Sequence, residues 1–132
     1  MAGETVGKID RGILLLLGVD RADSTEIAEK LAERVINYRI FPDAQGKMNL
    51  SLLDSCGELL IVSQFTLSAE TSKGRRPSFS SAATPELAKS LYDHFIQYSG
   101  SKVAKVQSGI FAADMQVSLT NDGPVTFLLE QL

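Results

Sequence analysis

The chain has 132 residues, of which 44% are hydrophobic and 22% are charged, and its net charge is −3. This length predicts one domain over residues 1–132, and the negative balance excludes a protein that attracts nucleic acid through an overall basic field. The single cysteine excludes an intrachain disulfide and fits a reducing compartment, so we expect a cytoplasmic protein. The longest apolar run, Ile13–Leu17, is too short to cross a bilayer, and we expect no membrane contact.

The first half of the chain carries strand patterns around one helix pattern. A short strand is predicted around Val6 and Ile9, and the apolar run Ile13–Val19 is typical of a strand that is buried on both faces. Asp23 or Ser24 can then cap a helix through its side-chain oxygen. Apolar residues follow at helical spacing and predict an amphipathic helix that lies on a sheet: Ile27, Leu31, Val35 and Tyr38.

The second half adds further strands around one more helix. Thr84 and Pro85 begin that helix with a hydroxyl cap and a proline in the first turn, and Gly100 ends it. The predicted strands are Met48–Leu53, Glu58–Leu67, Lys102–Ser108, Met115–Thr120 and Val125–Leu129. Because strands outnumber helices, we predict an α+β fold: a mixed, mostly antiparallel sheet with two helices packed on it.

Familiar catalytic and metal sites have little support in the sequence. His94 is the only imidazole, and its place at the edge of an apolar helical stripe predicts a rim position rather than a catalytic role. One histidine and one cysteine cannot form a closed structural zinc site. Cys56 is interpreted as an incidental thiol in a turn. No glycine-rich phosphate loop is present, so we expect neither a metal nor a cofactor.

Three polar stretches are candidate sites, and each also has a plain structural interpretation. Ser63–Leu67 ends a buried strand in hydroxyl and amide groups, which could line a pocket or simply be an exposed strand end. Lys73, Arg75 and Arg76 lie in a loop rich in serine, where they could bind phosphate or face solvent. Asn121–Thr126 could be an ordinary hairpin turn, or a rigid turn that presents backbone carbonyls to a small ligand.

Two of these stretches together resemble the signature motifs of the D-aminoacyl-tRNA deacylases. The motifs are Ser63-Gln64-Phe65-Thr66-Leu67 and Asn121-Asp122-Gly123-Pro124-Val125-Thr126, and the runs Leu14–Val19 and Lys73–Phe79 are also similar to that family. The resemblance covers nearly the whole chain. It implies the deacylase fold and an enzyme that hydrolyses the ester between a D-amino acid, or glycine, and the 3′-terminal adenosine of tRNA. Such an enzyme proofreads the chirality of charged tRNA.

The resemblance also implies roles at the end of the buried strand. Backbone N–H groups around Phe65 and Thr66 would stabilise the oxyanion, and Ser63 and Gln64 would hold the adenosine or the amino group. Thr66 has two candidate roles, as a nucleophile or as a positioning group. We favour positioning, because no side chain in the sequence stands out as its general base. The implied catalytic residues are Ser63, Gln64, Phe65 and Thr66.

The family that the chain resembles is a homodimer with an RNA-facing pocket at each side of the interface. Its Gly-Pro unit, here Gly123-Pro124, is cis and inserts into the pocket of the other subunit, where backbone carbonyls exclude an L side chain. The residues implied to bind the substrate are Asn121, Gly123, Pro124, Val125 and Thr126. Those implied to contact tRNA phosphates are Lys73, Arg75 and Arg76. Ser63 and Phe65 favour the D-specific branch over a sister branch that acts on L-alanine.

A second hypothesis starts from a difference between this chain and the family that it resembles. Members of this family usually begin with a further strand, and the chain starts after its expected place. Together with the missing side-chain base, this departure leaves open an inactive or truncated module of the same fold, which holds a tRNA end or only dimerises. Turnover of charged tRNA separates the two hypotheses.

Overall fold

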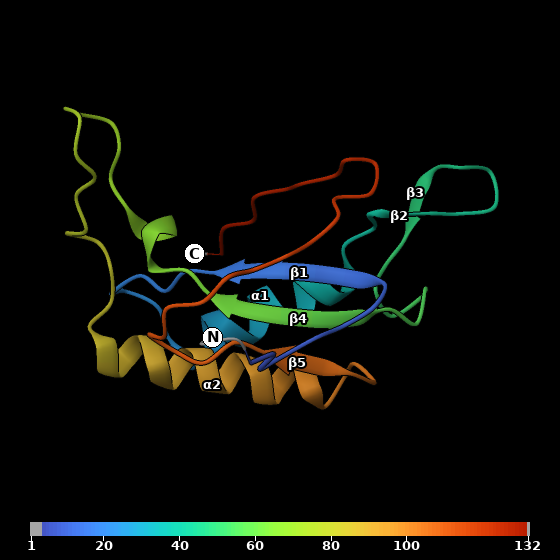
Figure 1. The fold of residues 1–132 in the computed structure, drawn as a ribbon, viewed down its shortest axis with the longest axis horizontal. Helices are drawn as coiled ribbons and strands as arrows, with labels where there is room; N and C mark the ends of the chain where they lie inside the picture. The colour runs from blue at the N-terminus through green and yellow to red at the C-terminus, as the bar shows by residue number, and fades with distance from the viewer. Residues whose placement is uncertain (1–3, 132) are drawn as a thin grey trace.

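The computed structural model describes residues 4–131. Its elements in chain order are β1 (Gly12–Leu17), α1 (Thr25–Asn37), β2 (Phe41–Pro42), β3 (Met48–Leu50), β4 (Glu58–Ser63), the 3₁₀ helix η1 (Phe65–Ser68), α2 (Pro85–Gly100) and β5 (Val106–Ser108). The three-stranded sheet has the order β1-β4-β5, and β2 and β3 form a separate small hairpin. In Figure 1, α1 passes behind β1 and β4, and α2 runs along β5. The predicted α+β class with two helices on a sheet is confirmed.

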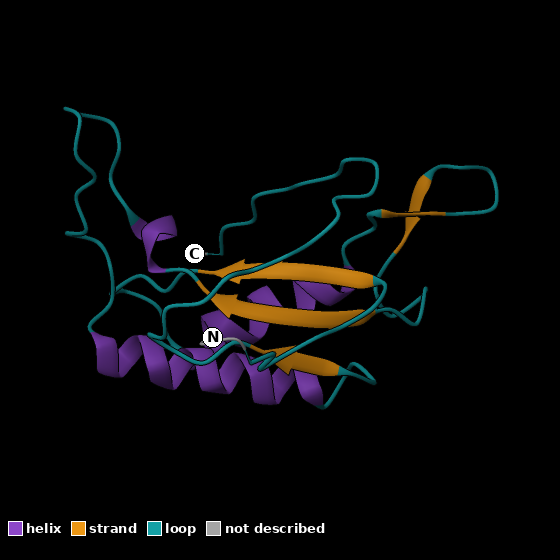
Figure 2. Cartoon of the chain, in the orientation of Figure 1, coloured by secondary structure: helices purple, strands orange, loops and turns teal. Residues whose placement is uncertain are grey.

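The direction of the strands differs from the sequence prediction. The sheet was expected to be mostly antiparallel, but β1 pairs with β4 in parallel, and β4 pairs with β5 in parallel. Only β2 and β3 are antiparallel among the described strands. The reason is connectivity, because α1 lies between β1 and β4 and α2 lies between β4 and β5. A crossover through a helix returns the chain in the same direction, as Figure 2 shows.

Both helices begin with the caps that the sequence predicts. The Ser24 hydroxyl accepts a hydrogen bond from the Ile27 N–H at 3.3 Å, and the Thr84 hydroxyl accepts one from Leu87 at 3.3 Å. Pro85 occupies the first turn of α2. The core lies between the helices and the sheet and contains buried side chains from both: Leu17, Val35, Ile36, Leu59, Ile61, Leu91, Tyr92 and Phe95.

Several predicted strands are shorter than expected or absent. β3 ends at Leu50, β4 ends at Ser63, and β5 begins only at Val106. Residues 6–9, 115–120 and 125–129 form no ladder with another described strand. Alternating apolar residues favour an extended backbone, but a strand also needs a partner for its N–H and C=O groups. Residues 115–129 are therefore an extended segment. In Figure 1 this segment runs along β1 towards the start of that strand and then turns back towards the C-terminus.

A layer of polar contacts joins the two helices. His94 Nε2 lies 2.9 Å from the Glu29 carboxylate, and the Tyr98 hydroxyl donates to Glu33 at 2.6 Å. The Glu33 carboxylate raises the pKa of Tyr98 by accepting that hydrogen bond. His94 is thus half-buried between helices, at the rim position that the sequence predicts. No helix in the described part of the chain is both long and apolar enough to cross a membrane.

Candidate active site

The first candidate site forms where β4 changes into η1. Ser63 is paired with Leu17 across the sheet, and the Gln64 N–H donates to the Leu17 carbonyl at 2.8 Å. The chain then turns, and the Leu67 N–H donates to the Gln64 carbonyl at 3.2 Å. This turn carries Phe65 and Thr66 out of the sheet, so that the Phe65 side chain is 64% exposed. The expected strand over residues 64–67 is therefore replaced by a 3₁₀ turn that presents the motif to solvent.

Gly18 allows this turn to pack closely on the end of β1. A Cβ atom on Gly18 would lie 2.9 Å from Leu67 Cβ and 3.3 Å from the Gln64 carbonyl oxygen. The buried Ser68 hydroxyl adds a hydrogen bond of 3.3 Å to the Val19 carbonyl. The backbone that follows β1 therefore holds η1 in place. Gly18 was not among the predicted site residues, although a lone glycine at the end of an apolar strand does signal close approach of another backbone.

The polar groups of the turn are arranged around Thr66. The Gln64 side-chain amide donates to the Thr66 hydroxyl at 2.6 Å. The backbone N–H groups of Phe65 and Thr66 donate to no acceptor within residues 4–131. Both residues are exposed, so these two donors are candidates to bind an oxygen atom of a ligand. The turn contains no group that titrates near neutral pH.

Groups that could supply acid–base or metal chemistry lie elsewhere. His94 is engaged with Glu29 between the helices. Cys56 is exposed in the turn that precedes β4. Within the described residues, no three side chains from histidine, cysteine, aspartate or glutamate gather where they could hold a metal ion. Within the described chain, the turn after β4 therefore offers backbone donors and neutral side chains.

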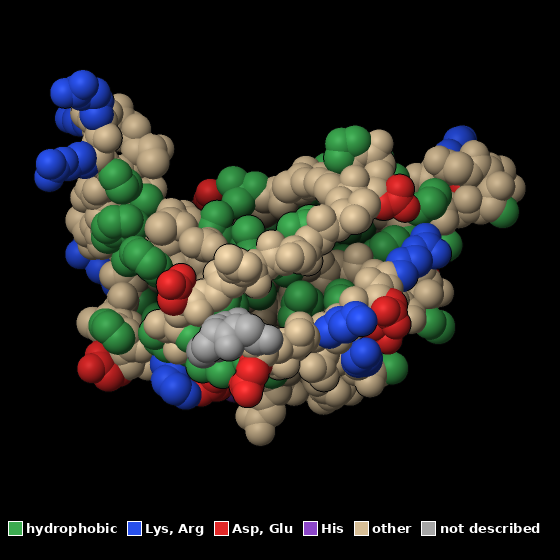
Figure 3. Space-filling view, in the orientation of Figure 1, with side chains coloured by type: hydrophobic (Ala, Val, Ile, Leu, Met, Phe, Trp, Pro, Cys, Tyr) green, Lys and Arg blue, Asp and Glu red, His purple; other side chains and the backbone are tan. Residues whose placement is uncertain are grey.

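The basic residues lie on a ribbon, residues 68–83, which projects from the body of the protein. The ribbon is closed by a bridge in which the Glu70 N–H donates to Ser78 at 2.6 Å and the Ser78 N–H donates to Glu70 at 3.0 Å. Lys73, Arg75 and Arg76 are exposed beyond this bridge and form no ion pair with the described part of the chain. Figure 3 shows these positive charges at the end of the arm, with hydrophobic side chains below them.

The second motif forms a turn held by its own side chains. The Val125 N–H donates to the Asn121 carbonyl oxygen Oδ1 at 2.8 Å, and Asn121 Nδ2 donates to the Thr126 hydroxyl at 2.8 Å. The Gly123-Pro124 peptide is cis, as the resemblance implied. Gly123 has a φ of +137°, and a Cβ there would lie 2.7 Å from Val125 Cγ2, so the position requires glycine. The turn is exposed apart from Val125, which is half-buried.

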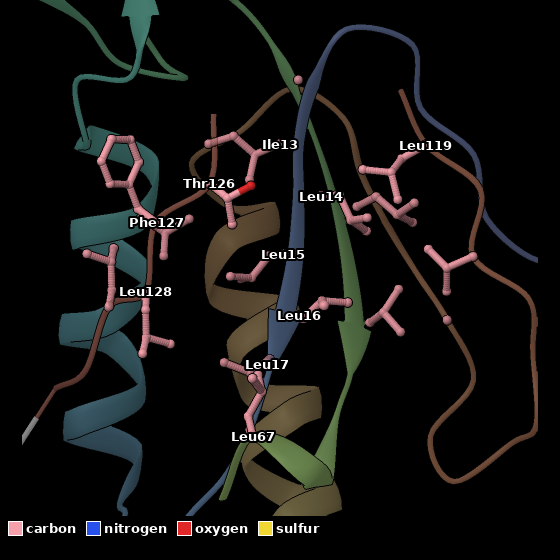
Figure 4. A pocket seen from close by; sticks show the side chains of 18 of the residues that line it. Ile13, Leu14, Leu15, Leu16, Leu17, Leu67, Leu119, Thr126, Phe127 and Leu128 are labelled. Atoms are coloured by element: carbon pink, nitrogen blue, oxygen red, sulfur yellow. The ribbon is translucent and has the colours of Figure 1, made fainter. Parts of the chain in front are cut away.

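The chain does not bring its two motifs together. In Figure 1 the turn at residues 121–126 lies towards the start of β1, whereas η1 lies beyond the end of β4, at the opposite end of the sheet. Between β1 and residues 114–131 is an open cavity of about 2490 Å³, lined largely by apolar side chains. In the view of Figure 4, Leu119 lies on one side of β1, and Phe127 and Leu128 lie on the other.

Known proteins with similar sequences come from several bacteria. The D-aminoacyl-tRNA deacylase of Geotalea uraniireducens (strain Rf4) is 62% identical over 97% of this chain and 83% of its own length. The enzyme of the same name from Haemophilus influenzae (strain KW20) is 63% identical over 96% of this chain and 88% of its own length. Each alignment therefore covers most of this chain and most of the relative.

The chain is also similar to solved structures and matches the sequence pattern of a family. A structure described as c-Myc DNA Unwinding Element Binding Protein has a TM-score of 0.88 and 38% identity, over 93% of this chain and 84% of that one. A probable eukaryotic D-amino acid tRNA deacylase, with a TM-score of 0.65 and 19% identity over 80% of this chain and 77% of that one, shares the fold. Residues 1–130 match the family described as D-Tyr-tRNA(Tyr) deacylase. The chain belongs to this deacylase family.

Proposed function

We propose that the protein hydrolyses the ester bond of D-aminoacyl-tRNA, and of glycine mischarged on tRNA, as a chiral proofreading step in the cytoplasm. One deacylase domain, residues 1–132, would carry the activity. The observation that supports this most directly is the pair of unpaired N–H groups on Phe65 and Thr66, exposed beside the Gln64–Thr66 hydrogen bond. In a member of a deacylase family, these groups provide what ester hydrolysis needs most, which is a site for the oxyanion.

In this mechanism the protein positions the ester, and the 2′-hydroxyl of the substrate assists the attack of water. Water adds to the ester carbonyl carbon, helped by the 2′-hydroxyl of the terminal adenosine, and the carbonyl oxygen becomes an oxyanion that accepts from Phe65 and Thr66 N–H. The bond to the ribose oxygen then breaks, and that oxygen takes the proton that the water loses, relayed by the 2′-hydroxyl. This step releases the amino acid and the tRNA. Ser63 and Gln64 hold the adenosine or the amino group. Thr66 acts as a positioning group, because the side chain bonded to its hydroxyl is the Gln64 amide, which is not a base.

The turn that contains Gly123 and Pro124 would discriminate between D and L substrates. We propose that a homodimer brings this turn from one subunit into the pocket of the other, where its carbonyls leave no space for an L side chain. The distance between the two motifs within one chain supports delivery by a second copy. Asn121 and Thr126 fix the turn, and Val125 packs against Gly123. A gate of main-chain atoms rejects one chirality without selecting a particular D side chain.

The projecting ribbon would bind the RNA. Lys73, Arg75 and Arg76 lack partners in the described chain, and guanidinium groups match phosphate oxygens well. Because the chain as a whole has a net charge of −3, the attraction for tRNA would be concentrated at this place. Phosphate contacts orient an RNA without reading its bases.

The direct test is deacylation of matched D-tyrosyl-tRNA and L-tyrosyl-tRNA by the purified protein. We expect the D ester to be hydrolysed and the L ester to persist. Equal hydrolysis of both esters would contradict the chiral gate. Binding of charged tRNA without hydrolysis would instead support an inactive module of the same fold, and would contradict the proposed function.

A further inference from the structure

An aromatic surface at the base of the ribbon adjoins the candidate oxyanion site. The rings of Phe65 and Phe79 lie 5.1 Å apart between centroids, with an angle of 46° between their planes. Their side chains are 64% and 38% exposed, although large apolar rings are usually buried. Phe65 belongs to the turn after β4, whereas Phe79 belongs to the returning arm of the ribbon. The pair thus joins the candidate active site to the basic arm.

The position of Phe79 is fixed by backbone contacts on both sides. Its neighbour Ser78 forms both hydrogen bonds of the bridge to Glu70. The Ala82 N–H donates to the Phe79 carbonyl at 3.1 Å, and the Arg21 N–H donates to the Ser81 carbonyl at 2.9 Å. The Ser81 hydroxyl also donates to the Ser68 carbonyl at 3.0 Å, which ties this arm to η1. The ring is therefore presented by a supported backbone rather than by a free loop.

We propose that Phe79, together with the outer part of Phe65, is a stacking platform for the unpaired nucleotides that precede the terminal adenosine of tRNA. This inference rests on the proposed function and adds the path that the RNA strand takes. The ester end of the RNA would lie at Phe65 and Thr66, the preceding bases would stack on Phe79, and their phosphates would reach Arg75 and Arg76.

The chemistry of the arm favours RNA over other occupants. Exposed aromatic rings beside unpaired cations are the usual means by which proteins hold single-stranded nucleic acid, because every base has a face that can stack. Residues 70–74 of the outgoing arm can span at most about 14 Å, which is enough to follow more than one stacked nucleotide at about 3.4 Å each. An apolar protein partner would leave Lys73, Arg75 and Arg76 without complementary charge.

The test compares two substrates and two substitutions. Phe79→Leu keeps an apolar side chain but removes the aromatic face, and Phe79→Tyr keeps the face. The substrates are D-tyrosyl-tRNA and D-tyrosyl-adenosine, which lacks the preceding nucleotides. We expect Phe79→Leu to raise KM for D-tyrosyl-tRNA about tenfold with little change in kcat, in line with the loss of one stacked base. Its effect on D-tyrosyl-adenosine should stay within about twofold, and Phe79→Tyr should retain the low KM for tRNA.

Other results would overturn the platform. These are an equal loss on both substrates, no loss on tRNA, a loss with Phe79→Tyr as large as with Phe79→Leu, or a change in oligomeric state on gel filtration. Leu53→Ala is the matched control, because Leu53 is also 39% exposed but lies in the turn after β3.

A binding measurement separates this proposal from the proposed function. Fluorescence anisotropy of uncharged tRNA requires no hydrolysis, and we expect Phe79→Leu to weaken that binding about tenfold. Unchanged binding would contradict the platform even if the enzyme deacylates D-tyrosyl-tRNA. Failure of the wild-type protein to hydrolyse D-tyrosyl-tRNA would contradict the proposed function, while weakened binding by the variant would still support the platform.

Discussion

The side-chain amide of Gln64 donates a hydrogen bond of 2.6 Å to the hydroxyl of Thr66, at the centre of the turn that follows β4. A carboxamide is not basic enough to remove a proton from a hydroxyl, whichever of its two ends faces Thr66. The pair therefore fixes the orientation of Thr66 without activating it. Whether Thr66 positions the substrate or acts as a nucleophile can therefore be decided by measurement.

We expect Thr66→Ala to lower kcat for D-tyrosyl-tRNA by only about fivefold, the effect of losing one hydrogen bond. Single-turnover kinetics with labelled D-tyrosyl-tRNA measures the chemical step directly. Thr66→Ser is the control that keeps the hydroxyl and should retain nearly full activity. If Thr66→Ala abolished the chemical step, or if a covalent ester to Thr66 accumulated in the wild type, Thr66 would be a nucleophile.

Gly18→Ala should distort the candidate active site without touching a substrate. The added Cβ would lie 2.9 Å from Leu67 Cβ, so η1 must move or the end of β1 must shift. We expect a loss of about 1–3 kcal/mol in the free energy of unfolding, measured in urea, together with lower deacylase activity. Gly100→Ala is the control, because a Cβ there meets nothing within 4 Å. Equal stability of the two variants would show that the contact at Gly18 is unimportant.

Asn121→Ala should weaken discrimination between D and L substrates. Asn121 both accepts from the Val125 N–H and donates to Thr126, so its loss frees the turn that contains Gly123. We expect the ratio of kcat/KM for D-tyrosyl-tRNA over L-tyrosyl-tRNA to fall about tenfold, as two modest hydrogen bonds disappear. Asn121→Asp keeps the acceptor and should lose less. A ratio unchanged in Asn121→Ala would argue that this turn does not form the chiral gate.

Neutralising Arg75 and Arg76 together to glutamine should weaken tRNA binding and make it less sensitive to salt. For two lost contacts with single-stranded RNA, the slope of log K against log salt concentration should become shallower by about 1.4. Anisotropy titrations between low and moderate salt measure this slope. Lys30→Gln on α1 removes an exposed charge away from the ribbon and should leave the slope unchanged. A slope equally altered by Lys30→Gln would point to overall charge rather than local contacts.

Asp54 should stabilise the turn before β4 in a pH-dependent way. Its carboxylate accepts from the Ser51 N–H at 2.9 Å, and this hydrogen bond lowers the pKa of Asp54 in the folded protein. The stabilisation is therefore present above the unfolded value of about 3.9 and is lost as the pH falls through the lower folded pKa. We expect Asp54→Asn to have a lower Tm than the wild type at pH 7, with a gap that closes in acid. A gap that does not narrow as the pH falls below the unfolded pKa of Asp54 would exclude this origin.

Several features were predictable from the sequence because they depend on a few neighbouring residues. The caps at Ser24 and Thr84 bond to N–H groups three residues away, so a short stretch encodes each helix start. Gly123 has to be glycine for the same local reason, since its φ of +137° excludes a side chain. The two signature motifs could likewise be identified in the chain without knowledge of its shape.

Other features depend on contacts between residues that are distant in the sequence, and only the tertiary structure determined them. The strand pattern continues to Leu67, but β4 ends at Ser63. There the Gln64 N–H donates to the carbonyl of Leu17 at the end of β1, and Gly18 leaves room for the 3₁₀ turn that follows. Residues 115–129 have strand-like sequences but no described ladder partner, and parallel pairing of β1 with β4 requires the intervening helix. The approach of Phe79 to Phe65 depends on how the ribbon folds back, which no local pattern specifies. A short stretch of sequence determines a local hydrogen bond, because both partners lie within it. The pairing of two strands, or the contact of two aromatic rings, depends on which distant segments the fold brings together.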